Sequence, residues 1–291
     1  AADVTFADGA DIITASAGTS NTRVGVNAGN SIESGGNYNV VVGDEAGTAI
    51  TTGDNNVAVG FEALKTLATS SQNTAVGHTA LKLNTAANNS AFGYGALAAN
   101  SSGTANLAVG RSALAANTTG DNNTAVGKSA LTANTTADNN TAVGQNALNV
   151  NTTGSENTAV GTNALDANTT AVNNTAVGYG SLTANTDGAQ NTAVGGRSME
   201  ANTTGANNTA FGWGSLVANT TGGALTALGR SALANNTTAS DNTAVGWFAL
   251  VANTTGANNT ATGKQALTAN TTGANNTAHG SRALLTNTTA A

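Results

Sequence analysis

The chain has 291 residues, a formal net charge of −6, 8% charged residues and neither Cys nor Pro. Soluble domains usually carry about a quarter charged residues, so this composition differs from that of an ordinary globular domain. Without Cys no disulfide framework is available, and the acidic balance disfavours nucleic acid and anionic membranes as partners. No apolar run approaches the ~20 residues of a membrane-spanning helix, so we expect no membrane insertion.

Residues 1–20 stand outside the repetition that fills the rest of the chain, and we expect them to form an N-terminal connector or cap. Residues 21–291 are a tandem repeat of 16 units, with steps of 18, 17, 17 and 16 residues and then of 17 throughout. A strict period predicts that every unit has the same structural role. The glycine of an AVG-like triplet, called the marker glycine below, stands at Gly25, Gly43, Gly60, Gly77, Gly93, Gly110, Gly127, Gly144, Gly161, Gly178, Gly195, Gly212, Gly229, Gly246, Gly263 and Gly280.

One unit, NNTAVGKSALTANTTAD at residues 122–138, has room for two short strands and two turns. NNTAVG contains β-branched residues and ends in Gly, which predicts a first strand. SALTA is interpreted as a second strand, with a single helical turn as the alternative, and NTTA or NTTG as the turn between units. Units stacked in register give an all-β parallel β-solenoid. Sixteen coils at ~4.8 Å each give a straight rod of roughly 75 Å.

Fixed columns of residues run through the units. The apolar residue before the marker glycine, such as Val126, and the Leu four residues after it, such as Leu131, are expected to face each other inside the coil. Asn recurs four residues before the marker, as at Asn123, and seven after it, as at Asn134. Stacked Asn side chains can form amide ladders, which is the structural interpretation we favour. N-glycosylation is the alternative, but two acceptor motifs per coil would be incompatible with tight ladders.

The residue two before the marker glycine is Ala in nearly every unit, as at Ala125 and Ala142. Neighbouring residues on a strand point to opposite faces, so if Val points into the coil, Ala points out. An outward face that is uniform instead of variable predicts burial against another chain. One Val, one Leu and a few Ala per coil also form a thin core. We therefore expect an obligate oligomer that is a fibre by shape.

The repeat resembles the head of YadA-like trimeric autotransporter adhesins, whose units read N-S-V-A-I-G-x-x-A-x-A-x-G. Asn122–Gly127 matches the first six positions, with Thr124 and Val126 on the two apolar ones and Ala130 on the later Ala. The resemblance implies a left-handed parallel β-roll and a homotrimeric, adhesive assembly. NTAVG…AL…NTTG arrays are also similar to those of bacteriophage tail fibres. The unit is longer here than in the bacterial heads, which favours the phage version.

The sequence offers little for catalysis or metal binding. His78 and His279 stand alone, and no pair of ligands has the spacing of a zinc site. The acidic turn at Gly43–Gly47 lacks the oxygen ligands of a calcium loop, although calcium is conceivable there. No nucleophile and base can be paired. We expect a protein that is not an enzyme and that has no cofactor and no metal site.

The residue directly after the marker glycine varies and is rich in aromatic and basic side chains. Exposed aromatic rings on a stacked scaffold suit sugar platforms, or contacts that cover gaps at the edge of a trimer interface. The receptor-contact stripe predicted on this basis comprises Phe61, Tyr94, Arg111, Lys128, Tyr179, Trp213, Arg230 and Trp247.

We expect a structural fibre or adhesin segment, a rigid trimeric spacer. Its partners would be itself, other fibre or virion proteins, and a host surface glycan or receptor. The expected location is the virion, in a tail fibre, with the extracellular bacterial surface as the alternative. An ice-binding β-solenoid is the rival function, because Thr ladders on a flat face can order water. Against it, Thr lies partly in turns and the flattest face is the Ala face. A polysaccharide depolymerase lacks an acid pair.

Overall fold

The computed structural model describes residues 17–290 and consists of one stack of coils, each with a single strand of three residues. Most of the connector predicted over residues 1–20 lies outside the described residues. The strands are β1 (Thr22–Val24), β2 (Val40–Val42), β3 (Val57–Val59), β4 (Thr74–Val76), β5 (Ser90–Phe92), β6 (Leu107–Val109), β7 (Thr124–Val126), β8 (Thr141–Val143), β9 (Thr158–Val160), β10 (Thr175–Val177), β11 (Thr192–Val194), β12 (Thr209–Phe211), β13 (Thr226–Leu228), β14 (Thr243–Val245), β15 (Thr260–Thr262) and β16 (Thr277–His279).

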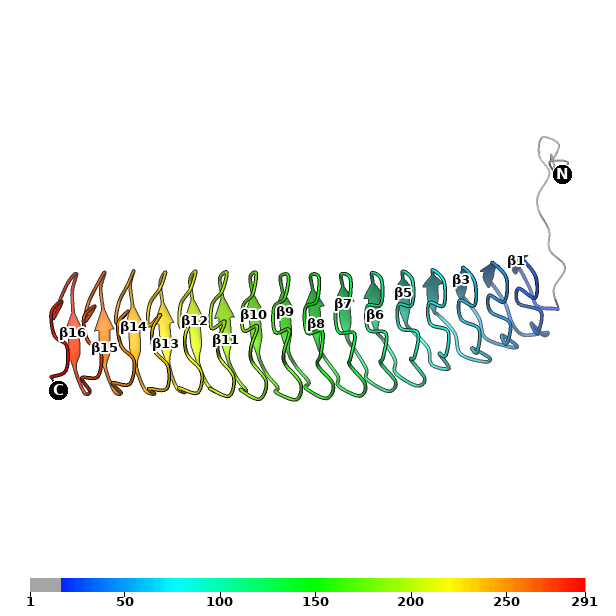
Figure 1. Ribbon diagram of the computed structural model, residues 1–291. Coiled ribbons are helices and arrows are strands. Elements are labelled where there is room, and N and C mark those ends of the chain that lie inside the picture. The colour runs from blue at the N-terminus through cyan, green and yellow to red at the C-terminus, as the bar shows by residue number, and fades with distance from the viewer. Residues whose placement is uncertain (1–16, 291) are drawn as a thin grey trace, which may run out of the picture.

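The strands form one parallel sheet of 16, ordered as in the sequence. Each strand pairs in register with the next, so that Ala125 of β7 lies opposite Ala142 of β8. Figure 1 shows the coils side by side along a rod, with β1 and β16 at opposite ends. The predicted all-β parallel solenoid with a 17-residue repeat is therefore confirmed. Among residues 17–290, no helix has the length and apolar character needed to cross a membrane.

The prediction that SALTA forms a second strand is wrong, because residues 129–133 form turns. Ser129 and Leu131 have φ angles of 59° and 52°, and the left-handed region is incompatible with an extended strand. The turns are nevertheless stacked, since the Leu131 N–H donates to the carbonyl of Ala147 in the next coil at 3.0 Å. Each coil is therefore held by a short strand on one side and by a ladder of hydrogen-bonded turns on the other.

The marker glycine is required by its backbone conformation. Gly127 has a φ of 139°, and a Cβ atom placed on it would lie 2.4 Å from the carbonyl oxygen of Gly144. Both the angle and the close approach of the next coil exclude a side chain. Because the same two conditions recur in every coil but the last, the column admits only Gly, and the chain turns away from the sheet at the same point each time.

The interior of the coil contains the Ala column and the Leu column. Leu131 is fully buried, as predicted, but so is Ala125, whereas Val126 is only half-buried on the opposite side of the strand. The predicted orientation of the strand was thus wrong. A coil that already holds a Leu and two Asn side chains has room for only a methyl group at this position, whereas the β2 coil, which has Gly47 in place of the Leu, holds Val41, also fully buried. Ala recurs from β3 to β16 for this reason, and it is no sign of a neighbouring chain.

Two buried Asn ladders complete the interior, as predicted. The Asn134 side-chain amide donates to Asn117 Oδ1 at 2.8 Å and to the Ala137 carbonyl at 3.0 Å. Asn123 donates to the same Ala137 carbonyl at 2.8 Å, and its backbone N–H donates to Asn106 Oδ1 at 2.9 Å. Asn134 has no exposed surface, so the NTT motif that it begins cannot receive a glycan in the folded chain. The ladders satisfy buried polar groups that would otherwise destabilise so thin a core.

Candidate functional site

The eight stripe residues all follow a marker glycine and form one exposed line where the strands end. The aromatic members keep between 40% of their surface exposed, at Trp247, and 63%, at Tyr179. The left-handed turn at each marker glycine brings the next side chain out of the coil and into solvent. The predicted exposure is therefore confirmed, whereas contact with a receptor stays a prediction.

In the N-terminal part of the stripe the rings stack on one another. The His78 ring lies between Phe61, at 5.3 Å between centroids, and Tyr94, at 4.9 Å. The guanidinium of Arg111 follows, 6.0 Å from the centre of the Tyr94 ring. His78 was left out of the predicted stripe, yet it is the centre of this stack. These rings use their faces on each other and offer mainly their edges to a partner.

In the C-terminal part, cations and indoles alternate along the stripe. The Arg230 guanidinium lies 5.3 Å from the Trp213 ring centre, and the Lys264 ammonium lies 4.9 Å from that of Trp247. Phe248 packs edge-on against Trp247, at 4.5 Å between centroids. Cation–π contacts of this kind stabilise exposed sites by about 0.5–1 kcal/mol each.

The outer face of the sheet is a second exposed surface, which sequence reasoning had placed inside the coil. It consists of the first and third residues of each strand, as in Thr124 and Val126, both half-buried. The third residue is apolar from β1 to β14, and neither position carries Asp, Glu, Lys or Arg in any strand. Larger members of this column, Phe92 and Phe211, are 40% and 43% exposed. The sequence contains a signal for this orientation. Asn123 and Ala125 are two residues apart and therefore lie on the same side of the strand, so a buried Asn ladder implies a buried Ala.

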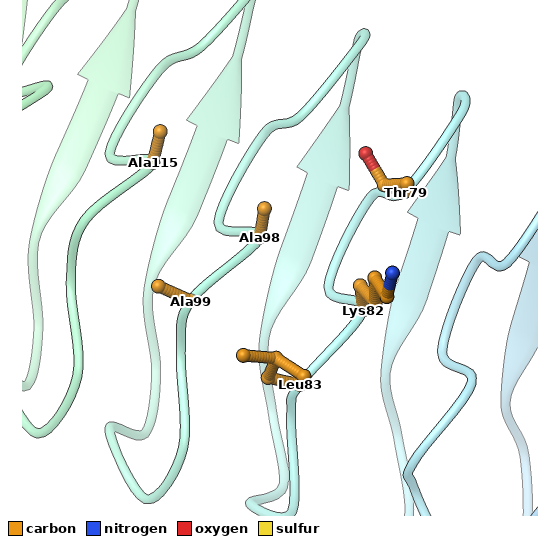
Figure 2. A pocket seen from close by; sticks show the side chains of 6 residues that line it. All are labelled: Thr79, Lys82, Leu83, Ala98, Ala99 and Ala115. Atoms are coloured by element: carbon orange, nitrogen blue, oxygen red, sulfur yellow. The ribbon is translucent and has the colours of Figure 1, made fainter.

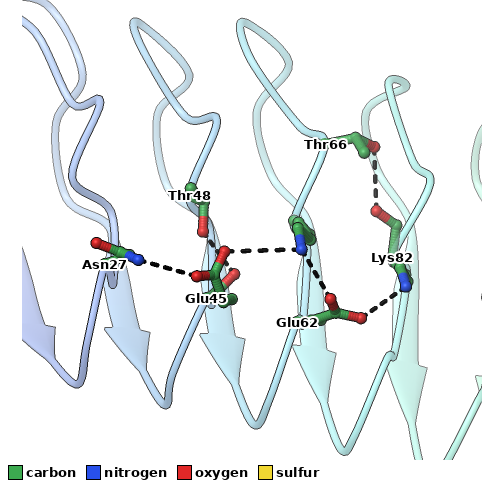
Figure 3. A network of polar contacts seen from close by, with 7 residues as sticks. Asn27, Glu45, Thr48, Glu62, Thr66 and Lys82 are labelled. Atoms are coloured by element: carbon green, nitrogen blue, oxygen red, sulfur yellow. Dashed lines mark hydrogen bonds and ion pairs between the residues drawn. The ribbon is translucent and has the colours of Figure 1, made fainter.

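Charged side chains near β1 to β4 form a network that joins successive coils (Figure 3). Glu62 binds Lys65 at 2.7 Å and Lys82 at 2.6 Å, and Lys65 also reaches Glu45 at 3.6 Å. Asn27 donates to Glu45 at 2.9 Å. The hydrogen bonds from Lys65 and then Lys82 lower the pKa of Glu62, and the pKa of Lys65 is raised chiefly by Glu62. The charges neutralise one another, which suits a structural role.

A shallow open groove of about 410 Å³ lies beside this network (Figure 2). It lies where Ala98 and Ala115 take a position that holds longer side chains in several other coils, such as Lys65 and Glu200, and Ala99 also lines it. Leu83 projects into it, and Thr79 and Lys82 complete the lining. The groove contains one cation and no acid, thiol or imidazole, so it offers no acid–base pair.

Among residues 17–290, no three His, Cys, Asp or Glu side chains are grouped so that they could hold a metal ion. In the acidic turn at Gly43–Gly47, Asp44 accepts the backbone N–H of Val26 at 3.0 Å, and Glu45 binds Lys65. His279 hydrogen-bonds Thr262 of the preceding strand. These groups have protein partners, and the expectation of a protein that is not an enzyme stays a prediction.

No protein-family model matches the chain, and no curated protein matches it. The resemblance to adhesin heads and phage fibres therefore rests on the repeat residues themselves.

Proposed function

We propose that the chain is a structural segment of an extracellular fibre, a rigid spacer in which three copies associate along their length. The observation that carries the proposal is the outer face of the sheet, which is uncharged along all of its strands and apolar in its third column as far as β14. Its place would be a phage tail fibre, or, alternatively, the surface of a bacterial cell. Other fibre or virion proteins would join its ends.

Rigidity follows from the bonds between coils. The sheet pairs every strand with the next, the turns are hydrogen-bonded on the opposite side of the coil, and the Asn134–Asn117 bond runs through the interior. Bending the rod in any direction would stretch one of these three rows. Because each coil contacts only its neighbours, length can be added without altering the cross-section. Both properties suit a spacer.

Association follows from the outer face. Sixteen strands at ~4.8 Å, each three residues of ~3.3 Å wide, give a face on the order of 750 Å². Stable protein interfaces bury about 800 Å² on each partner, so the whole face is close to the size that association requires, with its apolar side chains mainly in the third column. A face without charge, repeated in register, is complementary to the same face of another copy. The number three rests on the resemblance to trimeric heads.

Light scattering tests the proposal. At micromolar concentration the chain should have three times its mass of 28.1 kDa, and electron microscopy should show rods. Val177→Glu places a carboxylate in the middle of the outer face and should shift the mass towards the monomer. Thr153→Glu adds the same charge at an exposed turn and should leave the mass unchanged. A folded wild-type monomer would overturn the proposal.

An ice-binding solenoid is the second candidate, and one observation favours it. Thr occupies the first position of every strand from β7 to β16. These Thr side chains lie on the exposed face of the sheet, whereas those of the NTT motifs lie in the turns. The Ala face that argued against this function lies inside the coil. A flat array of hydroxyl and methyl groups could order water, provided that the face is not covered by another copy. Thermal hysteresis in the wild type, abolished by Thr209→Lys in a monomeric protein, would select this candidate over the fibre.

A further inference from the structure

The outer face of the sheet has two edges, one where the strands begin and one where they end. The two residues before the buried Asn that precedes each strand form the entry edge, as in Asp121 and Asn122. The two residues after each marker glycine form the exit edge, as in Lys128 and Ser129. Figure 1 shows the strands crossing the rod in the same direction, so each edge follows one side of the whole sheet.

The two edges carry opposite charges. From β4 to β16, no Lys or Arg stands on the entry edge, and no Asp or Glu stands on the exit edge. The acids of the entry edge in these coils are Asp121, Asp138, Glu156 and Asp241. The bases of the exit edge are Arg111, Lys128, Arg197, Arg230, Lys264 and Arg282. An uncharged face is thus bordered by acids on one side and by bases on the other.

Most of these charges have no opposite charge to bind within the chain. Arg197 binds Glu200 at 2.7 Å, but none of the other edge charges forms an ion pair among residues 17–290. Arg230 and Lys264 lie over indole rings, which leaves them positively charged. The charged network near β1 to β4 is neutralised within the chain, whereas the edges keep their charge for a partner.

We propose that this partner is another copy of the chain in parallel orientation, with the exit edge of one copy against the entry edge of the next. Rotation about the rod axis brings unlike edges together, whether two or three copies form the closed assembly. Bases then meet acids along every contact. A copy turned end for end would instead place bases against bases and acids against acids. The edges therefore select the parallel orientation.

The charges also lie at matching levels along the rod. Asp121 precedes β7 and Lys128 follows it. Asp241 precedes β14, and Arg230 and Lys264 follow β13 and β15, the strands on either side. One coil step is ~4.8 Å, which is shorter than the screening length of about 8 Å at physiological salt. Copies aligned without a shift along the rod thus bring opposite charges within range.

The uncharged face and the charged edges have different roles. An exposed ion pair contributes little by itself, so no single edge residue decides the orientation. Like charges placed together along an interface exclude the wrong arrangement, and complementary charges fix the register. The parallel orientation rests on the proposed fibre function for the association itself. It assigns the basic members of the predicted receptor-contact stripe to the contact between copies.

Cross-linking measures the orientation, because the chain has no Cys of its own. Asn139 on the entry edge and Gln145 on the exit edge are exposed and flank β8, the eighth of 16 strands. Gln145→Cys chains are coexpressed with Asn139→Cys chains that carry a size tag, and a short bismaleimide is added. Parallel copies should give mixed pairs only. Copies turned end for end would join each variant to itself, since the middle of one rod would meet the middle of the other.

Charge reversal tests whether the edges determine this orientation. The exit-edge variant carries Arg111→Glu, Lys128→Glu, Arg230→Glu and Lys264→Glu. The entry-edge variant carries Asn122→Lys, Asn139→Lys, Glu156→Lys and Asp241→Lys. Asp121 and Asp138 are kept, because each accepts a backbone N–H of the preceding coil. The third variant combines all eight substitutions, and circular dichroism verifies that each protein folds.

We expect the dissociation constant of the assembly at low salt to rise at least about tenfold in each single-edge variant and to recover in the combined variant. The entry-edge variant has a net charge closer to zero than the −6 of the wild type, so overall repulsion would not explain its dissociation. Cross-links within one variant, or single-edge variants that associate like the wild type, would overturn the parallel edges and leave the fibre standing. A folded wild-type monomer would overturn both.

Discussion

The side-chain amide of Asn134 donates to the side-chain oxygen of Asn117, one coil earlier, at 2.8 Å, and both residues are fully buried. Asn151 repeats the contact with Asn134 at 3.1 Å. A coil with so little apolar volume is thus held together by polar groups that saturate one another. Because each amide has a partner above and below, the cost of losing one member falls on its neighbours.

Replacing Asn134 with Ala should lower the free energy of unfolding by about 2–4 kcal/mol. The Asn117 side-chain oxygen would be buried without a donor, and the Asn151 amide would keep only its hydrogen bond to the Gly154 carbonyl. Thr136→Ala, at an exposed position two residues away, should change stability by less than about 0.5 kcal/mol. Urea unfolding of both variants measures the difference. Equal stabilities would show that the ladder contributes nothing beyond packing.

Ala125→Glu should destabilise the fold itself, because the carboxylate would stand in a fully buried column and would cost several kcal/mol. Val126→Glu, one residue further on, points outward and should leave the melting temperature of the dissociated chain nearly unchanged. Lys128→Glu, in the exposed stripe, should affect neither stability nor mass. The three variants are compared by circular dichroism and light scattering. A stably folded Ala125→Glu protein would contradict the inward orientation of this column.

Gly127→Ala should reduce stability by at least about 3 kcal/mol, through backbone strain at φ 139° and the clash with Gly144. Gly95 is the matched control. It also has a positive φ, of 65°, but nothing lies within 4 Å of an added Cβ atom, and a left-handed Ala costs about 1–2 kcal/mol. Thermal melts of the two variants separate conformation from contact. A loss at Gly127 no greater than at Gly95 would mean that neighbouring coils separate readily.

Asp166→Asn should stabilise the chain at neutral pH. Burial raises the pKa of Asp166 above its usual 3.8, although a hydrogen bond from Asn149 partly opposes this, and its Oδ1 atom has no hydrogen-bond partner. The raised pKa means that the protonated form is favoured in the fold. Burying the ionised carboxylate lowers the free energy of unfolding. This loss of stability is absent below pH 3.8 and develops as the pH rises through the raised pKa.

The gain from Asp166→Asn should be at most about 1 kcal/mol at pH 7, because the residue is only half-buried and solvent screens its charge. Melting temperatures measured from pH 3 to pH 7 should diverge as the pH increases. Asp138→Asn makes the same change at a carboxylate in another coil and serves as the comparison. If the difference in melting temperature between Asp166→Asn and the wild type were largest at pH 3, the pH dependence would have the opposite sign, and the raised pKa of Asp166 would be contradicted.

The period, the marker glycine, the buried Leu column and the two Asn ladders could be predicted from the sequence, because each depends on a residue type that recurs at a fixed position. Gly127 recurs since only glycine tolerates its backbone angle, and Asn134 recurs since its partners are its own equivalents in adjacent coils. Exposure of the stripe followed from its variability. None of these inferences required knowledge of how wide the coil is.

Only the tertiary structure decided which side of the strand faces inward. Hydrophobicity favoured Val126 over Ala125 as the inward residue, but side-chain volume decided the orientation, because Leu131 and two Asn side chains fill the rest of the coil. Val41 is buried at the equivalent position of β2, where Gly47 replaces the Leu. The stacking of His78 between Phe61 and Tyr94 likewise depends on the spacing between coils and on side-chain directions. A repeated sequence shows which residue type occupies each column, but the distances between the columns are set only when the chain folds into coils and the coils stack.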